Sequence, residues 1–390
     1  MKVLHVADGI DPSSGGGTAE RTFQLAKALQ RAGVSCTVLC TSEGLGAKRH
    51  AELEGIRLVA VRSLLRRFLL PAISGRRIAA LVAEADVIHF TGHWSVLGAR
   101  VCLAALRLNK PYVYCPAGAL RIFGRSVWIK RIYNRVVGRR IVKGASRCFA
   151  VTELEREQFH EYGVSDERIV LLPNGVDPDS TAVPDVVSFR ARYELDGKQV
   201  VLFLGRLSPI KGPDLLLEAF AAIAERHPDA VLVFAGPDDS LGLQLRAQAR
   251  DVGLSERVRF VGFLAGQAKQ DALAAADLLA VPSRREAMSL VALEAGLQGT
   301  PVMLTDQCGF DEVQGAGGGL VVAAQVDALA AGLDQLLGEP QALPVYGEKL
   351  RQLVLAQYTW DVLLGRAGQV YQQLSGVPFQ PASAPVNKQK

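Results

Sequence analysis

The chain has 390 residues, enough for two globular domains, and its 49% hydrophobic and 21% charged residues exclude a disordered or fibrous chain. No apolar run reaches the roughly 18 residues of a membrane-spanning helix. We expect no signal peptide, because the first apolar run is short and Asp8 follows it directly. Residues 1–150 hold 24 Lys and Arg against 8 Asp and Glu, whereas residues 151–390 hold 20 against 31. We therefore expect the first half to face an anionic partner.

Short apolar runs alternate with amphipathic helical stretches along nearly the whole chain. Strands are predicted at 3–7, 35–40, 57–61, 87–90, 112–115, 148–151 and 169–172, with helices at 19–32 and 153–162 among them. In the second half they are predicted at 200–204, 230–235, 258–261, 278–281, 302–304 and 319–322. Continuous apolar strands that alternate with helices are typical of parallel sheets covered on both faces. The α/β pattern runs twice, and it predicts two doubly wound domains.

A glycine-rich segment follows the first predicted strand. Ser13 and Ser14 lead into Gly15, Gly16 and Gly17, just before the first helix. Glycines let the backbone approach a ligand closely, and the N–H groups of a helix start attract an anion. The spacing does not match the Gly-x-Gly-x-x-Gly of dinucleotide-binding folds. The segment indicates either an anion site or an ordinary flexible connection.

Basic residues follow the strand predicted at 200–204. Gly205 and Arg206 come directly after it, and Lys211 precedes an amphipathic helix predicted at 213–226. In an open parallel sheet, ligands bind at the carboxyl ends of the strands. An Arg fork and a movable Lys charge suit a diphosphate, although a solvated basic loop remains an alternative.

Acidic residues follow the strand predicted at 278–281. Glu286 stands before a helix whose start we expect Ser289 to cap, and Glu294 lies about two turns further on in an apolar stretch. A carboxylate among apolar residues is costly unless a ligand or partner hydrogen-bonds it. Two exposed helix acids are the commoner alternative.

Together these segments resemble the retaining glycosyltransferases of family 4, which have the two-domain GT-B architecture. The resemblance covers most of the chain, and it rests on the order and separation of several motifs. These include the glycine-rich loop, Pro173-Asn174-Gly175-Val176-Asp177, Gly205-Arg206-Leu207 with Lys211-Gly212, Phe234-Ala235-Gly236, Phe260-Val261-Gly262-Phe263-Leu264, Glu286 with Glu294, and Tyr358-Thr359-Trp360.

The resemblance implies two Rossmann-like domains that face each other across a cleft. With turn signals after Asn174, it predicts an acceptor-binding domain at 1–180 and a donor-binding domain at 181–358. A helix at about 359–375 would return to the first domain, and residues 376–390, which hold three prolines, would form a flexible tail.

The resemblance also implies a role for each site residue. Arg206 and Lys211 would bind the diphosphate of a UDP- or GDP-linked sugar, Glu286 the hydroxyls of the transferred sugar, and Glu294 the ribose. The nucleotide sugar would be a co-substrate, with no other cofactor. Residues 262–264 would face the base, and residues 288–290 would offer N–H groups to the phosphates. The further donor contacts are thus Gly16, Gly17, Gly205, Gly262, Phe263, Leu264, Met288, Ser289 and Leu290.

Enzymes of this family are thought to react by front-face attack, in which the leaving phosphate helps to deprotonate the acceptor. The resemblance therefore implies retention of configuration without a protein nucleophile, and positive charge in place of a metal. Asp177-Pro178-Asp179 matches an Asp-x-Asp metal pattern, but it belongs to a turn, and we predict no metal site.

The first domain departs from the family at the acceptor side. Many relatives carry His or Arg where this chain has Ala117, in the segment that follows the strand at 112–115. His93 follows the strand at 87–90, where relatives often carry a second histidine that Thr91 replaces here. We expect His93 to contribute to the acceptor site and to catalysis, although a lone histidine is more often structural.

Basic and apolar residues alternate from Arg121 to Arg147 in the pattern of an amphipathic helix, and residues 62–71 repeat the theme as a loop. We interpret the pattern as contact with an anionic membrane surface, which predicts a cytoplasmic protein peripheral at the inner face of the cytoplasmic membrane. A core-packed helix with a solvated basic face is the alternative. Nucleic acid is disfavoured, because no nucleic-acid-binding motif accompanies the charge.

The predicted function is thus transfer of a sugar to a glycan or lipid-linked acceptor, in the synthesis of cell-surface polysaccharide or lipopolysaccharide. Two alternatives remain open at this point. One is another GT-B activity, such as a nucleotide-sugar epimerase. The other is a catalytically silent homologue that acts as a membrane-bound scaffold.

Overall fold

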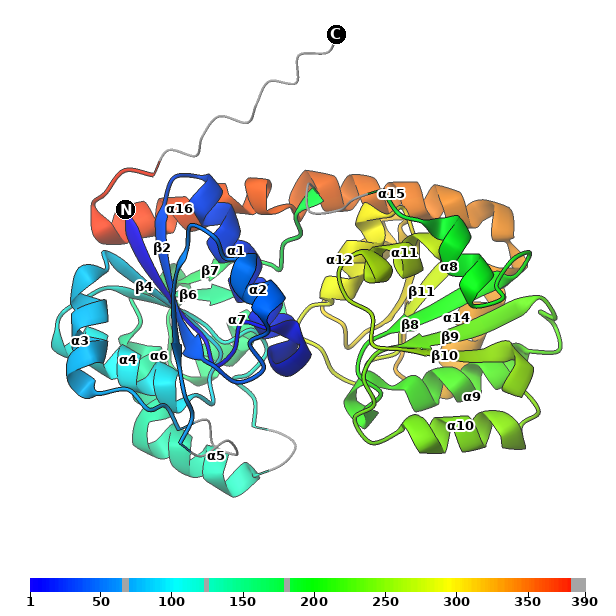
Figure 1. Ribbon diagram of the computed structural model, residues 1–390, viewed down its shortest axis with the longest axis horizontal. Coiled ribbons are helices and arrows are strands. Elements are labelled where there is room, and N and C mark those ends of the chain that lie inside the picture. The colour runs from blue at the N-terminus through cyan, green and yellow to red at the C-terminus, as the bar shows by residue number, and fades with distance from the viewer. Residues whose placement is uncertain (65–69, 123–125, 179–182, 380–390) are drawn as a thin grey trace, which may run out of the picture. The chain divides into compact units, whose positions relative to one another are not determined.

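The computed structural model describes residues 1–64, 70–122, 126–178 and 183–379. The chain divides into two compact units, one made of Met1–Gly175 with Trp360–Lys390 and the other of Val176–Thr359 (Figure 1). The chain thus passes between the units at 175/176 and again at 359/360. The sequence analysis placed the first of these crossings five residues later, at 180/181. Most of the tail predicted at 376–390 lies outside the described residues.

The first unit contains a seven-stranded sheet in which every pairing is parallel, in the order β3-β2-β1-β4-β5-β6-β7. The seven predicted strands are confirmed to within one residue at each end. Their bounds are β1 (Lys2–Val6), β2 (Ser35–Thr41), β3 (Arg57–Val61), β4 (Val87–Thr91), β5 (Tyr112–Cys115), β6 (Arg147–Ala150) and β7 (Ile169–Leu171).

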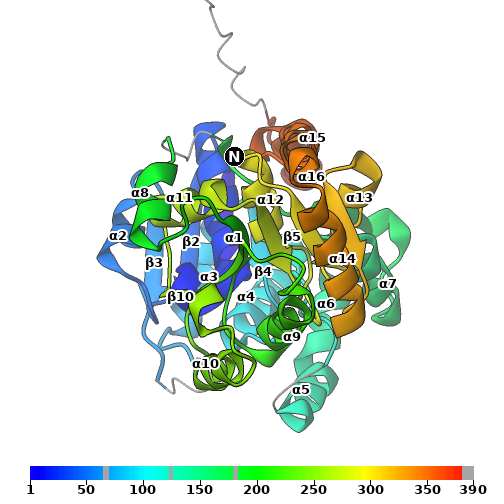
Figure 2. The ribbon, with the colours of Figure 1, turned by 90° about the vertical axis from the view of Figure 1, so that its right-hand side faces the viewer.

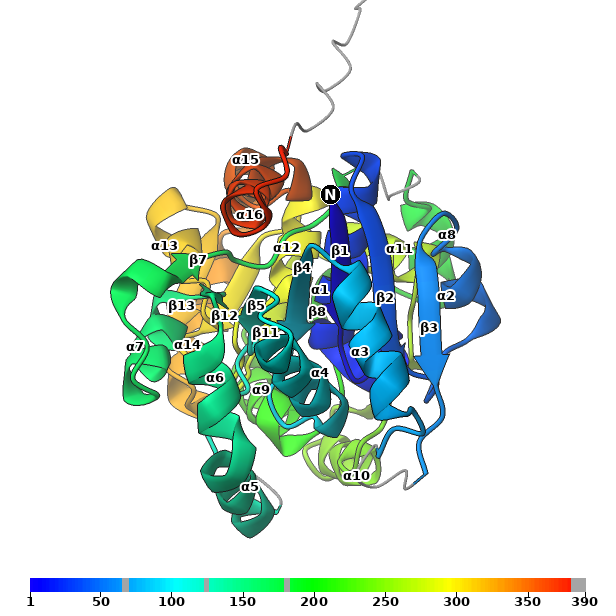
Figure 3. The ribbon, with the colours of Figure 1, turned by 90° about the vertical axis from the view of Figure 1, so that its left-hand side faces the viewer.

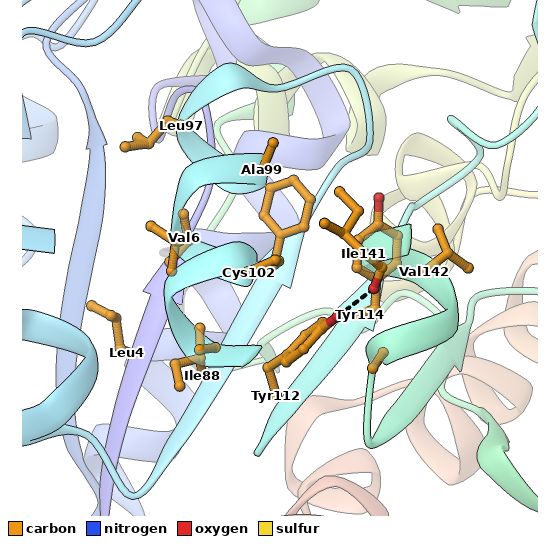
Figure 4. Close-up of a cluster of buried hydrophobic side chains, with 14 of the residues drawn as sticks. Leu4, Val6, Ile88, Leu97, Ala99, Cys102, Tyr112, Tyr114, Ile141 and Val142 are labelled. Carbon is orange, nitrogen blue, oxygen red and sulfur yellow. Dashed lines mark hydrogen bonds between the residues drawn. The ribbon is translucent and has the colours of Figure 1, made fainter. Parts of the chain in front are cut away.

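Helices cover both faces of this sheet, because its strands are apolar on both sides. One face carries α3 (Gly75–Glu84), α4 (Val96–Arg107), α6 (Arg139–Gly144) and α7 (Glu153–Glu161). The other face carries α1 (Pro12–Arg31) and α16 (Trp360–Ser375). In Figure 3, α3, α4 and α6 stand together in front of the sheet. Figure 4 shows Leu97 and Cys102 of α4 over Val6 and Ile88. The short α2 (Ala47–Ala51) precedes β3.

Two histidines lie buried on the face that α1 and α16 cover. His5 of β1 and His89 of β4 are paired in register, with stacked rings whose centroids are 5.4 Å apart. Tyr371 of α16 hydrogen-bonds His89 Nδ1 at 2.5 Å, whereas both ring nitrogens of His5 lack a partner among the described residues. Burial lowers the pKa of His5 from 6.5 to about 4, so the folded protein holds it neutral.

We expect the His5→Phe variant to gain stability over the wild type as the pH falls. Below pH 6.5 the unfolded chain protonates His5, while the folded protein resists protonation down to about pH 4. The difference in free energy of unfolding should therefore grow by roughly 3 kcal/mol between these pH values. Urea titrations of both proteins from pH 8 to pH 4 measure it. A difference that stays constant with pH would contradict the assignment.

The second unit contains a six-stranded parallel sheet in the order β10-β9-β8-β11-β12-β13. All six strands predicted there are confirmed: β8 (Gln199–Leu204), β9 (Ala230–Ala235), β10 (Val258–Gly262), β11 (Leu278–Val281), β12 (Val302–Thr305) and β13 (Gly319–Val322). Two apolar clusters, one on each face, form its core.

Each face of this second sheet has its own group of helices, as Figure 2 shows. One group is α9 (Pro213–Ile223), α10 (Gly242–Asp251) and α14 (Val326–Gly338). The other comprises α8 (Val186–Arg192), α11 (Gln267–Ala275), α12 (Leu290–Leu297), α13 (Glu312–Ala316) and α15 (Leu343–Gln357). A parallel sheet covered by helices in this way binds its ligands at the carboxyl ends of the strands.

The segment from Arg121 to Arg147 is helical but not one regular helix. It consists of α5 (Val127–Tyr133), a π-helical turn over Asn134–Gly138, and α6, while residues 123–125 lie outside the described part. Of the basic loop predicted at 62–71, residues 65–69 are likewise not described, and Ser63 pairs with Pro71 in an isolated antiparallel bridge. Within the described residues, none of the helices has the length and apolar character to cross a membrane.

Candidate functional site

The strand order of the second unit reverses between β8 and β11, which are neighbours in the sheet. At such a switch point the loops after the two strands run to opposite sides and leave room for a ligand. Gly205 and Arg206 follow β8, and Pro282, Ser283 and Arg284 follow β11. The two motifs that the sequence singled out therefore meet at one place.

Lys211 and Glu286 come together at this switch point. Lys211 Nζ donates to Glu286 Oε1 at 2.8 Å, and Ser283 Oγ donates to Glu286 Oε2 at 3.1 Å. The side chains are 23% and 12% exposed, so the pair is shielded yet open to a ligand. The sequence assigned Lys211 and Glu286 to separate ligand groups, and the structure places their charged atoms in direct contact. Ser283 was not predicted, although it lies only three residues before Glu286.

Backbone contacts hold the two loops against each other. Arg284 N donates to Ile210 O at 2.9 Å and joins the loops after β8 and β11, while Glu286 N donates at 2.8 Å to Gln307 O in the loop after β12. Gly212 has φ +68°, and a Cβ there would lie 2.1 Å from Pro282 O. Only glycine lets the loop after β8 approach the end of β11 this closely. Lys211 is therefore positioned by a close backbone contact.

Arg206 lies at the rim of the same site. Its guanidinium is 3.5 Å from Asp239 Oδ2, and its side chain is 55% exposed. Gly205 N donates to Ala235 O at 2.9 Å, which extends the pairing of β8 and β9 beyond the strands. An exposed pair at this distance contributes little to stability. Arg206 is thus available to an anionic ligand at little cost.

Glu294 of α12 forms an ion pair that the sequence did not foresee. Lys269 Nζ of α11 donates to Glu294 Oε1 at 2.6 Å, and the two side chains are 21% and 15% exposed. The contact supplies the partner that a carboxylate in an apolar stretch requires. Because 25 residues separate the two, no local pattern could have identified Lys269.

The start of α12 is capped as predicted. Ser289 Oγ accepts from Ala292 N at 3.3 Å. The expected row of N–H donors at Met288, Ser289 and Leu290 needs one correction, because Ser289 N already donates to Cys308 O at 3.1 Å. Met288 is 4% exposed and packs into the core. The N–H of Ser289 is therefore committed to the fold.

A pocket of about 190 Å³ lies beyond the carboxyl ends of β9 and β10. Gly262 and Phe263 line it, and the 53% exposed Phe263 lies on its surface, whereas Leu264 packs toward the core cluster on the α11 and α12 face. Arg246 of α10 stacks over Phe260, with its guanidinium carbon 4.2 Å from the ring centroid. Phe260, Phe263 and Arg246 give the pocket surfaces on which an aromatic ring stacks.

In the first unit, the glycine-rich loop interrupts a helix. Gly16 has φ 58° and ψ −146°, which are not helical values, inside the span of α1. Gly17, which follows it, is exposed. The sequence placed the helix start at residue 19, and the structure carries the helical turns back to Pro12 with Gly16 as the break.

His93 is built into the core of the first unit. Its Nδ1 is bonded to the Tyr114 hydroxyl at 2.5 Å and its Nε2 to Asn134 Oδ1 at 2.7 Å, and the residue is 1% exposed. Burial lowers its pKa to about 4. Both ring nitrogens are thus engaged, which favours the structural role that the sequence left open over the predicted acceptor role.

Ala117 lies in a tight loop with φ 49°, followed by Gly118 with φ 85°. Glu155, a buried carboxylate, accepts from Gly118 N at 2.5 Å and from Val151 N at 2.8 Å. Burial raises the pKa of Glu155 to about 7. The loop that carries histidine or arginine in relatives is therefore held by its backbone here.

Among the described residues there is no cluster of three or more His, Cys, Asp or Glu that is arranged to hold a metal ion. Of the Asp-x-Asp pattern, Asp177 is described, and Asp179 lies outside the described residues. Metal independence remains a prediction.

Two family models together match most of the chain. Residues 15–180 match the model described as Glycosyltransferase Family 4, and residues 188–353 match the one described as Glycosyl transferases group 1. The D-inositol 3-phosphate glycosyltransferase of Nocardia farcinica is 37% identical over 222 residues, which cover 54% of this chain and 49% of that protein. The chain thus spans about half the length of the curated relatives it matches most strongly.

Solved structures match over nearly the whole chain. Anabaena HepE in complex with UDP-glucose is 22% identical, with a TM-score of 0.78 over 97% of this chain and all of that one. A putative UDP-N-acetylglucosamine 2-epimerase from Listeria monocytogenes is 17% identical, with a TM-score of 0.64 over 97% of this chain and 98% of that one. At such identities the likeness is one of fold.

Proposed function

This chain belongs to the group 1 glycosyltransferases of family 4, with the GT-B fold, and we propose from this that it transfers a sugar from a nucleotide-diphosphate sugar to a glycan or lipid-linked acceptor. The anomeric configuration is retained and no metal takes part. The reaction belongs to the assembly of cell-surface polysaccharide or lipopolysaccharide, at the cytoplasmic face of the membrane.

The observation that carries this proposal is the contact between Lys211 and Glu286 at the switch point. An ammonium and a carboxylate side by side match a ligand with an anionic diphosphate next to a hydroxyl-bearing sugar. When the donor binds, Lys211 exchanges Glu286 for a phosphate oxygen. Glu286 keeps its hydrogen bond from Ser283 and accepts a sugar hydroxyl in place of Lys211.

The chemistry follows from these charges. As the bond between the sugar and the diphosphate breaks, negative charge grows on the leaving oxygen. Lys211 and Arg206, the latter exposed and only loosely paired, stabilise that charge. The acceptor hydroxyl attacks from the same face, and its proton goes to the departing phosphate. No side chain has to act as a nucleophile.

The other site residues hold the nucleoside. Glu294 Oε1 lies 2.6 Å from Lys269 Nζ, and Glu294 binds the ribose hydroxyls while Lys269 orients its carboxylate. The backbone at Gly262, Phe263 and Leu264 faces the base. The pocket beside Phe263 adds aromatic surface there.

The test is a screen of nucleotide sugars, because the fold also occurs in a putative epimerase. We expect one UDP- or GDP-linked sugar to raise the melting temperature most and to release its nucleoside diphosphate. A nucleotide sugar that returns with an inverted hydroxyl and stays intact would identify an epimerase instead. No turnover with any donor would identify a silent homologue.

We also propose that α5 attaches the protein to an anionic membrane. Four large apolar side chains of the segment 127–138 face solvent, with exposed fractions of 47 to 75%: Trp128, Ile129, Ile132 and Val136. Exposed arginines flank them at 131, 135, 139 and 140. The opposite side is anchored, since Asn134 bonds His93 and Tyr162. An exposed apolar stripe with a cationic border suits an interfacial helix.

The double variant Ile132→Ser with Val136→Ser should bind anionic vesicles at least roughly tenfold more weakly, because each side chain loses its apolar burial. Sedimentation with phosphatidylglycerol vesicles measures this, and the emission of Trp128 should shift to the blue only in the wild type. Leu243→Ser is the matched control, since Leu243 is 84% exposed in the other unit. Equal binding to phosphatidylglycerol and phosphatidylcholine vesicles would contradict the electrostatic part of the proposal.

A further inference from the structure

The sheet of the first unit has a switch point of its own. Its order reverses between β1 and β4, which are hydrogen-bonded neighbours. The rule that places ligands at the carboxyl ends of strands applies there as well. Asp8 follows β1, and Trp94 and Ser95 follow β4. None of the three belongs to the donor site.

Asp8 is held rigidly across this point. Ser95 Oγ donates to Asp8 Oδ1 at 2.5 Å and accepts from Gly98 N at 2.8 Å, as the N-cap of α4. Because the hydroxyl has one proton and Gly98 occupies one of its lone pairs, that proton is directed at Asp8. Asp8 O accepts from Thr41 N at 3.1 Å. Strand β2 thus holds the backbone of Asp8, and the N-cap of α4 holds its carboxylate.

This carboxylate is incompletely satisfied. Within the described part of the chain, Ser95 is the one side chain that hydrogen-bonds it, and no basic side chain forms an ion pair with it. Burial raises the pKa of Asp8 to about 6, and the hydrogen bond from Ser95 opposes this shift. Glu155 shows the contrast, since both of its oxygens accept from backbone N–H groups. Asp8 has one oxygen left for a donor that the protein does not supply.

A second unsatisfied group lies in the facing loop. The indole Nε1 of Trp94 is buried without a hydrogen-bond partner among the described residues. Buried polar groups are normally paired, so an orphaned donor at a ligand-binding edge indicates a missing acceptor. Each of the two loops of this switch point thus holds a polar group that lacks a partner in the described part of the protein. A hydroxyl group can donate its proton to the open oxygen of Asp8.

We propose that Asp8 binds a hydroxyl group of the acceptor, which makes the acceptor at this point a sugar or polyol with no negative charge. The inference rests on the proposed glycosyl transfer and specifies its acceptor side. A phosphate or carboxylate at this place would be repelled by Asp8, whereas a hydroxyl is oriented by it. Anionic parts of the acceptor therefore lie away from the ends of β1 and β4.

The experiment separates transfer to a hydroxyl compound from hydrolysis of the donor by water. Wild type and Asp8→Asn are compared with the nucleotide sugar that the screen selects, using glycerol, myo-inositol and methyl glucoside as probe acceptors. We expect Asp8→Asn to lower transfer to the probes roughly ten- to hundredfold, because a hydrogen bond to a charged group is lost. Hydrolysis and nucleoside diphosphate affinity should stay at the wild-type level.

Two further variants keep the result decisive. Asp86→Asn is the matched control, because Asp86 precedes β4 at the opposite edge of the sheet, where it accepts from Lys2 N at 2.7 Å. It should leave transfer unchanged. Ser95→Ala keeps the carboxylate of Asp8 but removes the hydrogen bond that orients it. Its rate of transfer should lie between those of the wild type and Asp8→Asn, and it can be measured even if Asp8→Asn folds poorly.

Three outcomes would overturn the inference. Asp8→Asn could transfer sugar at the wild-type rate, or it could lose transfer and donor hydrolysis equally. The third is a wild-type enzyme that transfers sugar to none of the probe acceptors. A wild type that neither hydrolyses a donor nor transfers its sugar to any probe would instead refute the proposed function, and the inference with it.

Discussion

Lys211→Met and Glu286→Gln should each lower the rate of sugar transfer by roughly 10²- to 10³-fold, as expected for the loss of a group that stabilises developing charge. Lys211 then no longer meets the leaving phosphate, and Glu286 no longer orients the sugar. Both variants should fold, because the pair is partly open to solvent and contributes about 1 kcal/mol to stability. Initial rates with saturating donor measure the effect.

The matched control is Arg190→Met. Arg190 forms a 3.0 Å ion pair with Asp277 in the same unit, with exposed fractions of 20% and 35%. Asp277 precedes β11, and it also accepts from Val200 N at 2.7 Å, so this pair lies at the opposite ends of the same two strands. The Arg190→Met variant should lose stability and keep the turnover of the wild type. Near-normal turnover by either site variant would refute the assignment of the donor site.

Gly212→Ala should destabilise the protein by about 3 kcal/mol or more and abolish transfer as well. The new Cβ would lie 2.1 Å from Pro282 O and would force the loop of Lys211 away from the end of β11. The left-handed φ of +68° adds strain of about 1 kcal/mol. Chemical denaturation and turnover assays measure the two effects.

Gly253→Ala isolates the strain from the clash. Gly253 has nearly the same φ, +72°, but a Cβ there meets no atom within 4 Å. This variant should lose only about 1 kcal/mol and remain active. If the two variants lost the same stability and activity, the close contact at Gly212 would have no role in positioning Lys211.

The sheets, and the position of Arg206 and Glu286 at the ends of strands, were predictable because their signals are local. Strands covered on both faces are apolar throughout, so each appears as a continuous run such as 230–235. Arg206 and Glu286 come shortly after such runs, and parallel strands bring their carboxyl ends to one edge. Strand order decides which ends are neighbours, and the sequence pattern did not predict that order.

The partners of these residues could not be predicted, because they are distant in sequence. Lys269 reaches Glu294 from another helix, and Ser95 reaches Asp8 across 87 positions. Ser289 was correctly expected to cap α12, but the hydrogen bond of its N–H to Cys308 depends on how β12 and its loop pack. Such contacts are set by tertiary structure, and periodicity carries no information on them.

The first unit shows the same limit at the segment from Arg121 to Arg147. Its amphipathic pattern predicted a helix, and the helix is present, but Asn134 bonds His93 and Tyr162 where the π-helical turn begins. Those contacts place His93 in a buried hydrogen-bond network, and its role at the acceptor site stays a prediction. A single-sequence pattern registers the residue types and not the network that joins them.

The central claim is that the loops after β8 and β11 bind the diphosphate of the donor. Calorimetric titration of the wild type, Lys211→Met and Arg190→Met with a nucleoside diphosphate, and with the matching nucleoside, tests it most directly. We predict that Lys211→Met lowers the affinity for the diphosphate by at least roughly tenfold and leaves the affinity for the nucleoside unchanged. Arg190→Met should bind both ligands as the wild type does. Equal affinity of all three proteins for the diphosphate would contradict the claim.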